Sequence, residues 1–328
     1  MCTGLTLKTN DGYHLFGRNM DLEYTFGQSV VLVPRNFKYE DKVSGQDKNT
    51  KYAVIGMAAL NGKHPLFAEA LNEKGLACAG LNFPAAYWSK EVVEGMDNIA
   101  PYDLILWITS NFETLEELKP HLDKLNIVGK AYDEKTPLPT LHWIVTDTSG
   151  KSLVIEKTED GLKIFDNPVG VMTNAPSFDW HLKNLTQYTG LTTSRPDTRK
   201  WSDLELVTLG NGSGAFGLPG DSSSQSRFVK TAFLKSHVTI GDYENAGVIE
   251  FFNILSNVAM ISGTVIDPHG RNEITQYTSC MCQEKGIYYY RTYKNSQINI
   301  IDMNKEDLSS DKLKVYTYND EPSFNYEN

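Results

Sequence analysis

The chain has 328 residues, a formal net charge of −10 and 40% hydrophobic residues, proportions typical of a globular protein with a substantial core. The acidic balance argues against a nucleic-acid partner, which requires a basic face. The longest apolar run, Tyr52–Leu60, is too short to cross a bilayer, and no basic, apolar leader opens the chain. We therefore expect a cytoplasmic bacterial protein without stable membrane association.

The N-terminus carries the most informative residue. The chain opens Met1-Cys2-Thr3-Gly4, so loss of one methionine leaves an α-amino group and a thiol on the same residue. A cysteine thiolate is a strong nucleophile, and an α-amino group titrates near ~8, so it accepts a proton at neutral pH. Cys2 is therefore a candidate nucleophile that carries its own base. The alternative is an inert cysteine on a buried strand.

The first third of the chain is dominated by strand patterns. Asn10-Asp11-Gly12 predicts a tight turn between the first two strands, and Lys38–Lys51 is typical of a polar loop. We expect strands at Cys2–Lys8, Tyr13–Asn19, Ser29–Pro34, Tyr52–Ala59 and Leu76–Leu81.

Helices and further strands follow. Thr114 and Glu117 have the spacing of a capping box. We expect helices at Tyr102–Ser110, from Thr114, at Ser224–Leu234 and at Asn245–Ile261. The remaining strands are expected at Leu141–Asp147, Ser152–Glu156, Leu162–Phe165, Val169–Met172, Ile274–Cys282, Gly286–Tyr293 and Gln297–Met303. Strands at both ends and no Pro/Gly/Ser linker indicate a single layered α+β domain over residues 1–328.

Charged residues are expected beside Cys2. If the first two strands pair, Arg18 and Asp21 come within a few residues of the thiol. A guanidinium next to a thiol favours the thiolate, and a carboxylate near the α-amine would orient it. The alternative is a structural Arg–Asp pair on an edge strand.

Three further polar residues follow predicted strands or begin helices. Asn82 and Asn174 are neutral donors suited to an oxyanion hole, although each is also compatible with a simple turn. Arg227 begins a helix after a flexible loop, where it suits an anion or transition-state contact. The run Gly212–Gly217 fits G-x-G-x-x-G, but no strand–turn–helix context surrounds it, so we reject dinucleotide binding.

The other cysteines and the histidines indicate neither a disulfide framework nor a metal site. Cys280 and Cys282 form a C-x-C pair without a second cluster at zinc spacing, and Cys78 stands alone. We therefore expect no metal and no cofactor.

Several motifs together resemble one family, the conjugated bile salt hydrolases (choloylglycine hydrolases), in order over nearly the whole chain. These are Met1-Cys2-Thr3, Gly17-Arg18-Asn19-Met20-Asp21, Asn72-Glu73-Lys74-Gly75-Leu76, Gly80-Leu81-Asn82-Phe83-Pro84, Leu141-His142-Trp143, Thr173-Asn174, Gly217-Leu218-Pro219-Gly220-Asp221 and Tyr288-Tyr289-Tyr290-Arg291-Thr292-Tyr293.

The resemblance implies an N-terminal-nucleophile hydrolase with a four-layer αββα sandwich, usually a homotetramer. It implies that Cys2 attacks the amide joining a bile acid to glycine or taurine, forming a thioester that water then opens. Arg18 and Asp21 would hold and tune the nucleophile, Asn82 and Asn174 would assist the tetrahedral intermediate, and Arg227 would complete the site. No metal or cofactor is implied.

Candidate walls for an apolar steroid are the hydrophobic residues near the Cys2 end of the sheets. They are Met20, Leu22, Tyr24, Phe26, Leu60, Phe67, Ala68 and Leu138. The nearest alternatives are a penicillin V acylase, from which Asn82 leads us away because those relatives commonly carry Tyr there, and an N-acyl-homoserine-lactone amidase. A glutaminase domain would need a second, phosphoribosyl-binding domain, for which no segment is a candidate. A non-catalytic amphiphile-binding protein is the remaining alternative.

Overall fold

The computed structural model describes residues 1–328 and contains two large antiparallel sheets. The six-stranded sheet has the order β14 (Val171–Met172), β1 (Cys2–Lys8), β2 (His14–Leu22), β17 (Ile274–Cys282), β18 (Ile287–Thr292) and β19 (Asn299–Asp302). The eight-stranded sheet has the order β13 (Gly161–Asp166), β12 (Ser152–Thr158), β11 (Leu141–Thr146), β8 (Ala77–Asn82), β7 (His64–Asn72), β6 (Val54–Asn61), β3 (Gln28–Val33) and β20 (Lys314–Tyr316).

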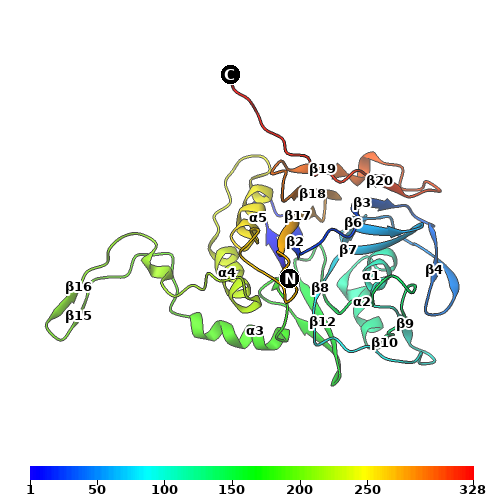
Figure 1. The fold of residues 1–328 in the computed structure, drawn as a ribbon, viewed down its shortest axis with the longest axis horizontal. Coiled ribbons are helices and arrows are strands. Elements are labelled where there is room, and N and C mark those ends of the chain that lie inside the picture. Colours follow the sequence, from blue (N-terminus) through cyan, green and yellow to red (C-terminus); the bar gives the residue numbers. More distant parts are fainter.

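Helices cover the outer face of each sheet. Helices α1 (Leu104–Asn111) and α2 (Leu115–Leu122) lie on the eight-stranded sheet, whereas α4 (Ser224–His237) and α5 (Ala246–Ser256) lie on the six-stranded sheet (Figure 1). Helix α3 (Phe178–Leu185) packs beside α4. The expected αββα sandwich is therefore confirmed. No helix is long and apolar enough to cross a membrane.

Two hydrophobic cores hold these layers together. The larger core lies between the two sheets and extends to α4 and α5, and it includes Cys2, Leu5, Ile55 and Phe251. The second core joins the eight-stranded sheet to α1 and α2, and it includes Val54 and Trp107. Because alternate residues of a strand point to opposite faces, the central eight-stranded sheet contributes to both cores.

The first hairpin forms as the turn chemistry predicts. Strands β1 and β2 pair with Cys2 opposite Met20 and Gly4 opposite Arg18, and Gly12 adopts a positive φ of 91° in the turn. Gly17 allows close strand approach, because an added Cβ would lie 2.1 Å from the Ser279 carbonyl oxygen on β17. The hairpin therefore places Cys2 opposite Met20, three residues from this close approach of the strands.

Some expected boundaries are wrong. The polar segment 38–51 forms a hairpin of β4 (Lys38–Asp41) and β5 (Gln46–Asn49), and the chain also contains β7 and α3, which were not expected. The helix expected to reach Ile261 ends at Ser256. Beyond it the chain packs against β17, where the Met260 N–H donates to Thr275 Oγ1 at 2.8 Å. The shorter paired segments are β9 (Asp97–Ile99) with β10 (Leu125–Ile127) and β15 (Arg199–Trp201) with β16 (Leu204–Leu206).

The segment between α3 and α4 forms an arm that projects from the body of the molecule, with β15 and β16 at its tip (Figure 1). Its apolar side chains are exposed: Trp201 is 71% and Leu204 64% accessible. The Gly212–Gly217 run lies in this arm beside a short 3₁₀ turn, with no strand–helix junction, as expected.

Candidate active site

Cys2 begins β1 and is buried with only 3% of its surface exposed. Its side chain and that of Arg18 lie on the inner face of the six-stranded sheet, as the register of the hairpin requires. Arg18 Nη2 donates to Cys2 Sγ and also lies 3.3 Å from Met20 Sδ, while Nη1 donates to the Gly80 carbonyl at 2.8 Å. The sulfur therefore lies against a guanidinium whose other donors are bound to fixed acceptors.

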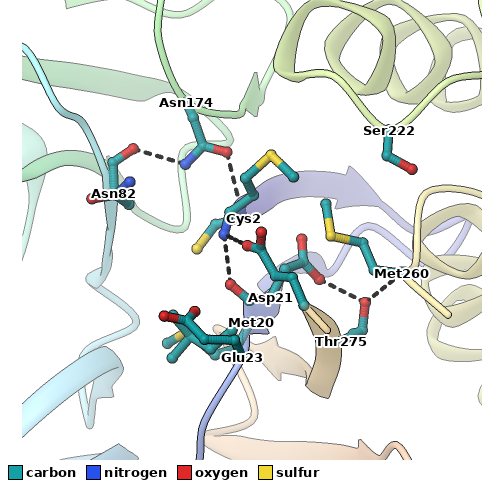
Figure 2. A network of polar contacts seen from close by, with 12 residues as sticks. Cys2, Met20, Asp21, Glu23, Asn82, Asn174, Ser222, Met260 and Thr275 are labelled. Atoms are coloured by element: carbon teal, nitrogen blue, oxygen red, sulfur yellow. Dashed lines mark hydrogen bonds and ion pairs between the residues drawn. The ribbon is translucent and has the colours of Figure 1, made fainter. Parts of the chain in front are cut away.

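The main chain of Cys2 is held by a second arginine and an asparagine. The Cys2 N–H donates to Asn174 Oδ1 at 2.9 Å, and Arg227 Nη2 donates to the same oxygen at 2.7 Å. Arg227 Nη1 donates to the Cys2 carbonyl and to Thr3 Oγ1. Asn174 Nδ2 reaches the Asn82 carbonyl at 2.7 Å, so Asn174 links Cys2 to Asn82 (Figure 2). The expected oxyanion residues thus lie together beside the nucleophile candidate.

Asp21 lies on the other side of β2. Its Oδ1 accepts from Thr275 Oγ1 at 2.6 Å, whereas its Oδ2 is buried without a partner. The Met1 ammonium donates to the Asp21 carbonyl at 2.6 Å and pairs with Glu273. The carboxylate of Glu273 and the main-chain carbonyl of Asp21 therefore hold the amino terminus of the chain.

Burial and neighbouring charges oppose each other in setting the pKa of these charged groups. It lowers the pKa of Arg227, against the opposing charges of Asp21 and Cys2. It raises the pKa of Asp21, which Arg227 and the N-terminal ammonium partly oppose. For Arg18, burial acts to lower the pKa, but the charges of Cys2, Tyr277 and Glu69 outweigh it and the pKa is raised. Arg18 therefore stays a cation beside the sulfur.

Two buried imidazoles support the asparagine from behind. His142 Nε2 lies 2.9 Å from the Thr173 carbonyl and His181 Nε2 lies 2.9 Å from the Asn174 carbonyl. His142 Nδ1 is in turn 3.0 Å from Glu156 Oε1. These contacts fix the backbone that carries Asn174. Scattered histidines gave no sequence signal for this role.

The expected steroid walls lie in different surroundings. Tyr24 and Leu60 are exposed, Met20 is buried beside Arg18, and Leu22, Phe26, Ala68 and Leu138 are partly buried. The structure corrects the expectation that Phe67 lines the pocket. Phe67 is 5% exposed and packs in the core between the eight-stranded sheet and its helices. It faces away from Cys2 and is removed from the candidate pocket.

The site contains no cluster of His, Cys, Asp or Glu that could hold a metal ion. The site brings together a cysteine sulfur, the amino terminus, two arginines and an asparagine amide. This combination suits nucleophilic attack on a carbonyl group.

Comparison with known proteins identifies the family. The model for linear amide C–N hydrolases of the choloylglycine hydrolase family matches residues 2–316. The chain belongs to this family. A bile salt hydrolase/transferase of Clostridium perfringens is 50% identical over 100% of both chains, and one of Lactiplantibacillus plantarum is 41% identical over 99% of each.

Solved structures agree with the assignment to the choloylglycine hydrolases. The C2A mutant of the conjugated bile acid hydrolase from Clostridium perfringens has a TM-score of 0.94 at 50% identity, with 100% of both chains covered. A penicillin V acylase from Agrobacterium tumefaciens shares the fold, with a TM-score of 0.75 at 21% identity over 96% of this chain and 90% of the other. The resemblance predicted from the motifs is confirmed, and the protein is a hydrolase of linear amide C–N bonds.

Several residues of this choloylglycine hydrolase site were missed in the sequence. Glu69 and Glu273 contact Arg18 and the amino terminus respectively, and Tyr277 and Tyr288 surround Glu69. Glu69 did leave a signal, since it is an acid within the apolar run Leu66–Leu71. Glu273 left none.

Proposed function

We propose that this protein hydrolyses the amide bond of glycine- or taurine-conjugated bile salts with Cys2 as its nucleophile. The contact of Arg18 with the Cys2 sulfur is the single observation that carries the proposal, because it favours the thiolate at the chain's start. Relatives at 50% and 41% identity are named bile salt hydrolase/transferase, which supports the choice of substrate.

The proposed mechanism begins with removal of Met1, which frees the amine of Cys2. The thiolate attacks the amide carbonyl, and Asn82 and Asn174 donate to the resulting oxyanion. The Cys2 ammonium then gives its proton to the departing glycine or taurine, and a thioester remains on sulfur. Water, deprotonated by the same amine, opens the thioester and restores the thiol.

The charged residues keep this nucleophile in position. Asp21, with an unpartnered buried carboxylate oxygen, would accept from the freed amine and orient its lone pair. Arg227 holds the Cys2 carbonyl and the Asn174 side chain, so it fixes both attacking and stabilising groups. The role of Arg227 follows from its contact with Cys2, whereas that of Asp21 follows from its unpartnered oxygen near the start of the chain.

Recognition of the steroid would be mainly apolar. Burying about 300–400 Å² of a steroid contributes roughly 7–10 kcal/mol gross at ~25 cal/mol/Å², before ordering costs. We assign this steroid-binding surface to the candidate wall residues that remain once Phe67 is excluded. They are Met20, Leu22, Tyr24, Phe26, Leu60, Ala68 and Leu138.

A second candidate activity uses the same intermediate. The relatives from Clostridium perfringens and Lactiplantibacillus plantarum are named for transfer as well as hydrolysis. The proposed thioester can be opened by an amine in place of water, which would re-form an amide with a different amino acid. The ratio of transfer product to free bile acid at rising amine concentration measures this activity.

We also propose a homotetrameric, cytoplasmic enzyme that consists of one choloylglycine hydrolase-like domain. The exposed apolar arm supports assembly, since isolated apolar surface of this kind is typical of an interface. Four free cysteines support a reducing compartment. The core shared by both sheets supports a single domain.

The decisive experiment compares substrates and thiols. Purified protein is incubated with glycocholate, taurocholate and penicillin V, and released glycine, taurine and phenoxyacetate are measured. We expect release from the bile salts, abolished by Cys2→Ala and retained by Cys78→Ala, a change of another buried free cysteine. Preferential cleavage of penicillin V, or an active Cys2→Ala protein, would contradict the proposal.

A further inference from the structure

A buried carboxylate lies behind the active-site arginine. Glu69 on β7 is fully buried between the two sheets. Its Oε2 accepts from Tyr277 Oη at 2.9 Å, and its Oε1 accepts from Tyr288 Oη at 2.6 Å. Both tyrosines belong to the opposite sheet, on β17 and β18. An acid in the middle of a hydrophobic core is costly unless it is paired and hydrogen-bonded, so its presence needs an explanation.

One β-bulge in β7 and another in β17 orient the side chains of Glu69 and Tyr277 toward each other. On β7, Phe67 pairs with Ala58 and Glu69 pairs with Met57, which leaves Ala68 as the extra residue. On β17 the register shifts similarly between Thr275 and Tyr277. A bulge reverses the alternation of side chains along a strand. Phe67 therefore faces the helices, whereas Glu69 faces the sheet-to-sheet core.

Arg18 lies between this carboxylate and the nucleophile. Arg18 Nη1 is 3.9 Å from Glu69 Oε2, and Arg18 Nη2 contacts the Cys2 sulfur. The side chains of Arg18 and Glu69 are both inaccessible to solvent. Burial raises the pKa of Glu69, and Arg18 with the hydroxyls of Tyr288 and Tyr277 opposes that rise. The charged groups around the sulfur are thus linked in a line from Glu69 through Arg18 to Cys2.

The remaining charged groups face the site from other elements. Arg227 on α4 donates to the Cys2 carbonyl, and the amino terminus donates to the Asp21 carbonyl and pairs with Glu273. Glu69 alone among the carboxylates makes an ion pair with Arg18, although the charge of Asp21 also acts on Arg18. Arg227 also has its charge opposed by Asp21. Removal of Glu69 would take away the carboxylate that pairs with Arg18 and leave the Arg18 charge opposed by Cys2, Tyr277 and Asp21.

We propose that Glu69 is a positioning residue for the nucleophile, which holds the Arg18 guanidinium against the Cys2 sulfur and offsets part of its charge. This inference rests on the proposed role of Cys2. Tyr277 and Tyr288 in turn hold the carboxylate. Glu69 keeps the Arg18 guanidinium oriented within the buried core. It also limits how strongly Arg18 favours the Cys2 thiolate, because a thiolate that is stabilised too strongly is a weaker nucleophile.

The test measures the ionisation of Cys2 directly. Iodoacetamide alkylation of Cys2 is followed by intact mass across pH in the wild type and in Glu69→Gln. We expect the midpoint of the rate–pH profile to fall by about one pH unit, the size of a Coulomb interaction over several Å at an effective dielectric of ~20. The acid limb of kcat should shift in the same direction, with KM for glycocholate changed less than about twofold.

Controls separate positioning from stability. Glu73→Gln, four residues along the chain and paired with Arg35, should lower thermal stability while leaving the alkylation profile unchanged. If Glu69→Gln does not fold, Tyr288→Phe provides a milder version with a smaller shift in the same direction. In an Arg18→Leu background, Glu69→Gln should produce a clearly smaller shift, because only the direct field of Glu69 on the sulfur remains and the part that acts through Arg18 is lost.

The outcomes distinguish a positioning role of Glu69 from a purely structural one. An unchanged profile in folded Glu69→Gln or Tyr288→Phe, with only a lower unfolding temperature, would make Glu69 purely structural. A shift of the same size with and without Arg18 would also overturn the proposal. Failure of the proposed function has a different signature, namely wild-type protein that does not cleave bile salts, or does so after complete alkylation of Cys2.

Discussion

At the scale of single residues, Asn174 connects most of the site. Its side-chain oxygen accepts from the Cys2 N–H and from Arg227, and its amide nitrogen donates to the Asn82 carbonyl. Asn174→Ala should therefore lower kcat by about 10²–10³-fold, the usual cost of one oxyanion-hole donor, with a smaller effect on KM. Steady-state kinetics with glycocholate measures both constants.

The control for this prediction is Asn184→Ala. Asn184 is also buried, but its side-chain oxygen accepts from Gln187 on the neighbouring turn and makes no hydrogen bond to Cys2 or Arg227. It should keep wild-type kcat. Equal losses in the two variants would mean that Asn174 acts through stability alone.

Residues close in sequence were the most predictable part of the site. Arg18 and Asp21 were predicted beside Cys2 because one hairpin register fixes all three, and the structure has that register. Glu273, by contrast, reaches the amino terminus from a distant segment, so no local pattern could indicate it. Its neighbour Thr275 contacts Asp21 for the same reason.

At the scale of elements, the start of α4 determines where Arg227 lies. Ser223 caps the helix by accepting from the Ser226 N–H. Asp221 accepts from the Ser223 N–H at 2.9 Å and from Ser226 Oγ at 2.5 Å. These hydrogen bonds lower the pKa of Asp221 to about 2. The cap therefore depends on an ionised carboxylate.

The sign of the pH dependence follows from that lowered pKa. Asp221 contributes its stabilisation fully above its ordinary value of 3.8 and loses it as the pH falls through about 2. Asp221→Asn should lower Tm by about 1–2 °C at pH 7, a small change because Asp221 is exposed. Thermal scans should show the difference between the two proteins shrinking below pH 4. A constant difference down to pH 2 would argue against this cap.

Element boundaries were predicted well only where local patterns decide them. β1 and β17 were predicted to the residue, since alternation and flanking turns define them. β7 was missed because its bulge at Ala68 breaks the alternation on which strand prediction depends. α5 was predicted too long because the contact of Met260 with Thr275 is tertiary.

At the scale of the whole molecule, the sandwich came from family resemblance rather than from periodicity. Sequence patterns cannot order strands whose neighbours are far apart, such as β2 with β17 or β3 with β20. For the projecting arm, the sequence indicates only a flexible loop before Arg227. Its exposed apolar tip has no counterpart in local propensity, and in the proposed tetramer other copies of the chain would cover it.

The arm provides a test of assembly. Trp201→Asp with Leu204→Asp should convert a tetramer to smaller species, because charges oppose burial of the tip. The unfolding of the isolated subunit should change little, since the arm lies outside both cores. Native mass spectrometry reports the assembly, with Val92→Asp, another exposed apolar position, as the control. Unchanged tetramers would place the interface elsewhere.

The central claim is that Cys2, freed of Met1, forms a covalent acyl intermediate. Rapid mixing with glycocholate, acid quench and intact-mass analysis tests it most directly. The account predicts a protein lacking Met1 that gains one cholyl group, lost again when the quench is delayed and absent in Cys2→Ala. Full activity in protein that retains Met1, or an acyl group found on any other residue, would contradict it.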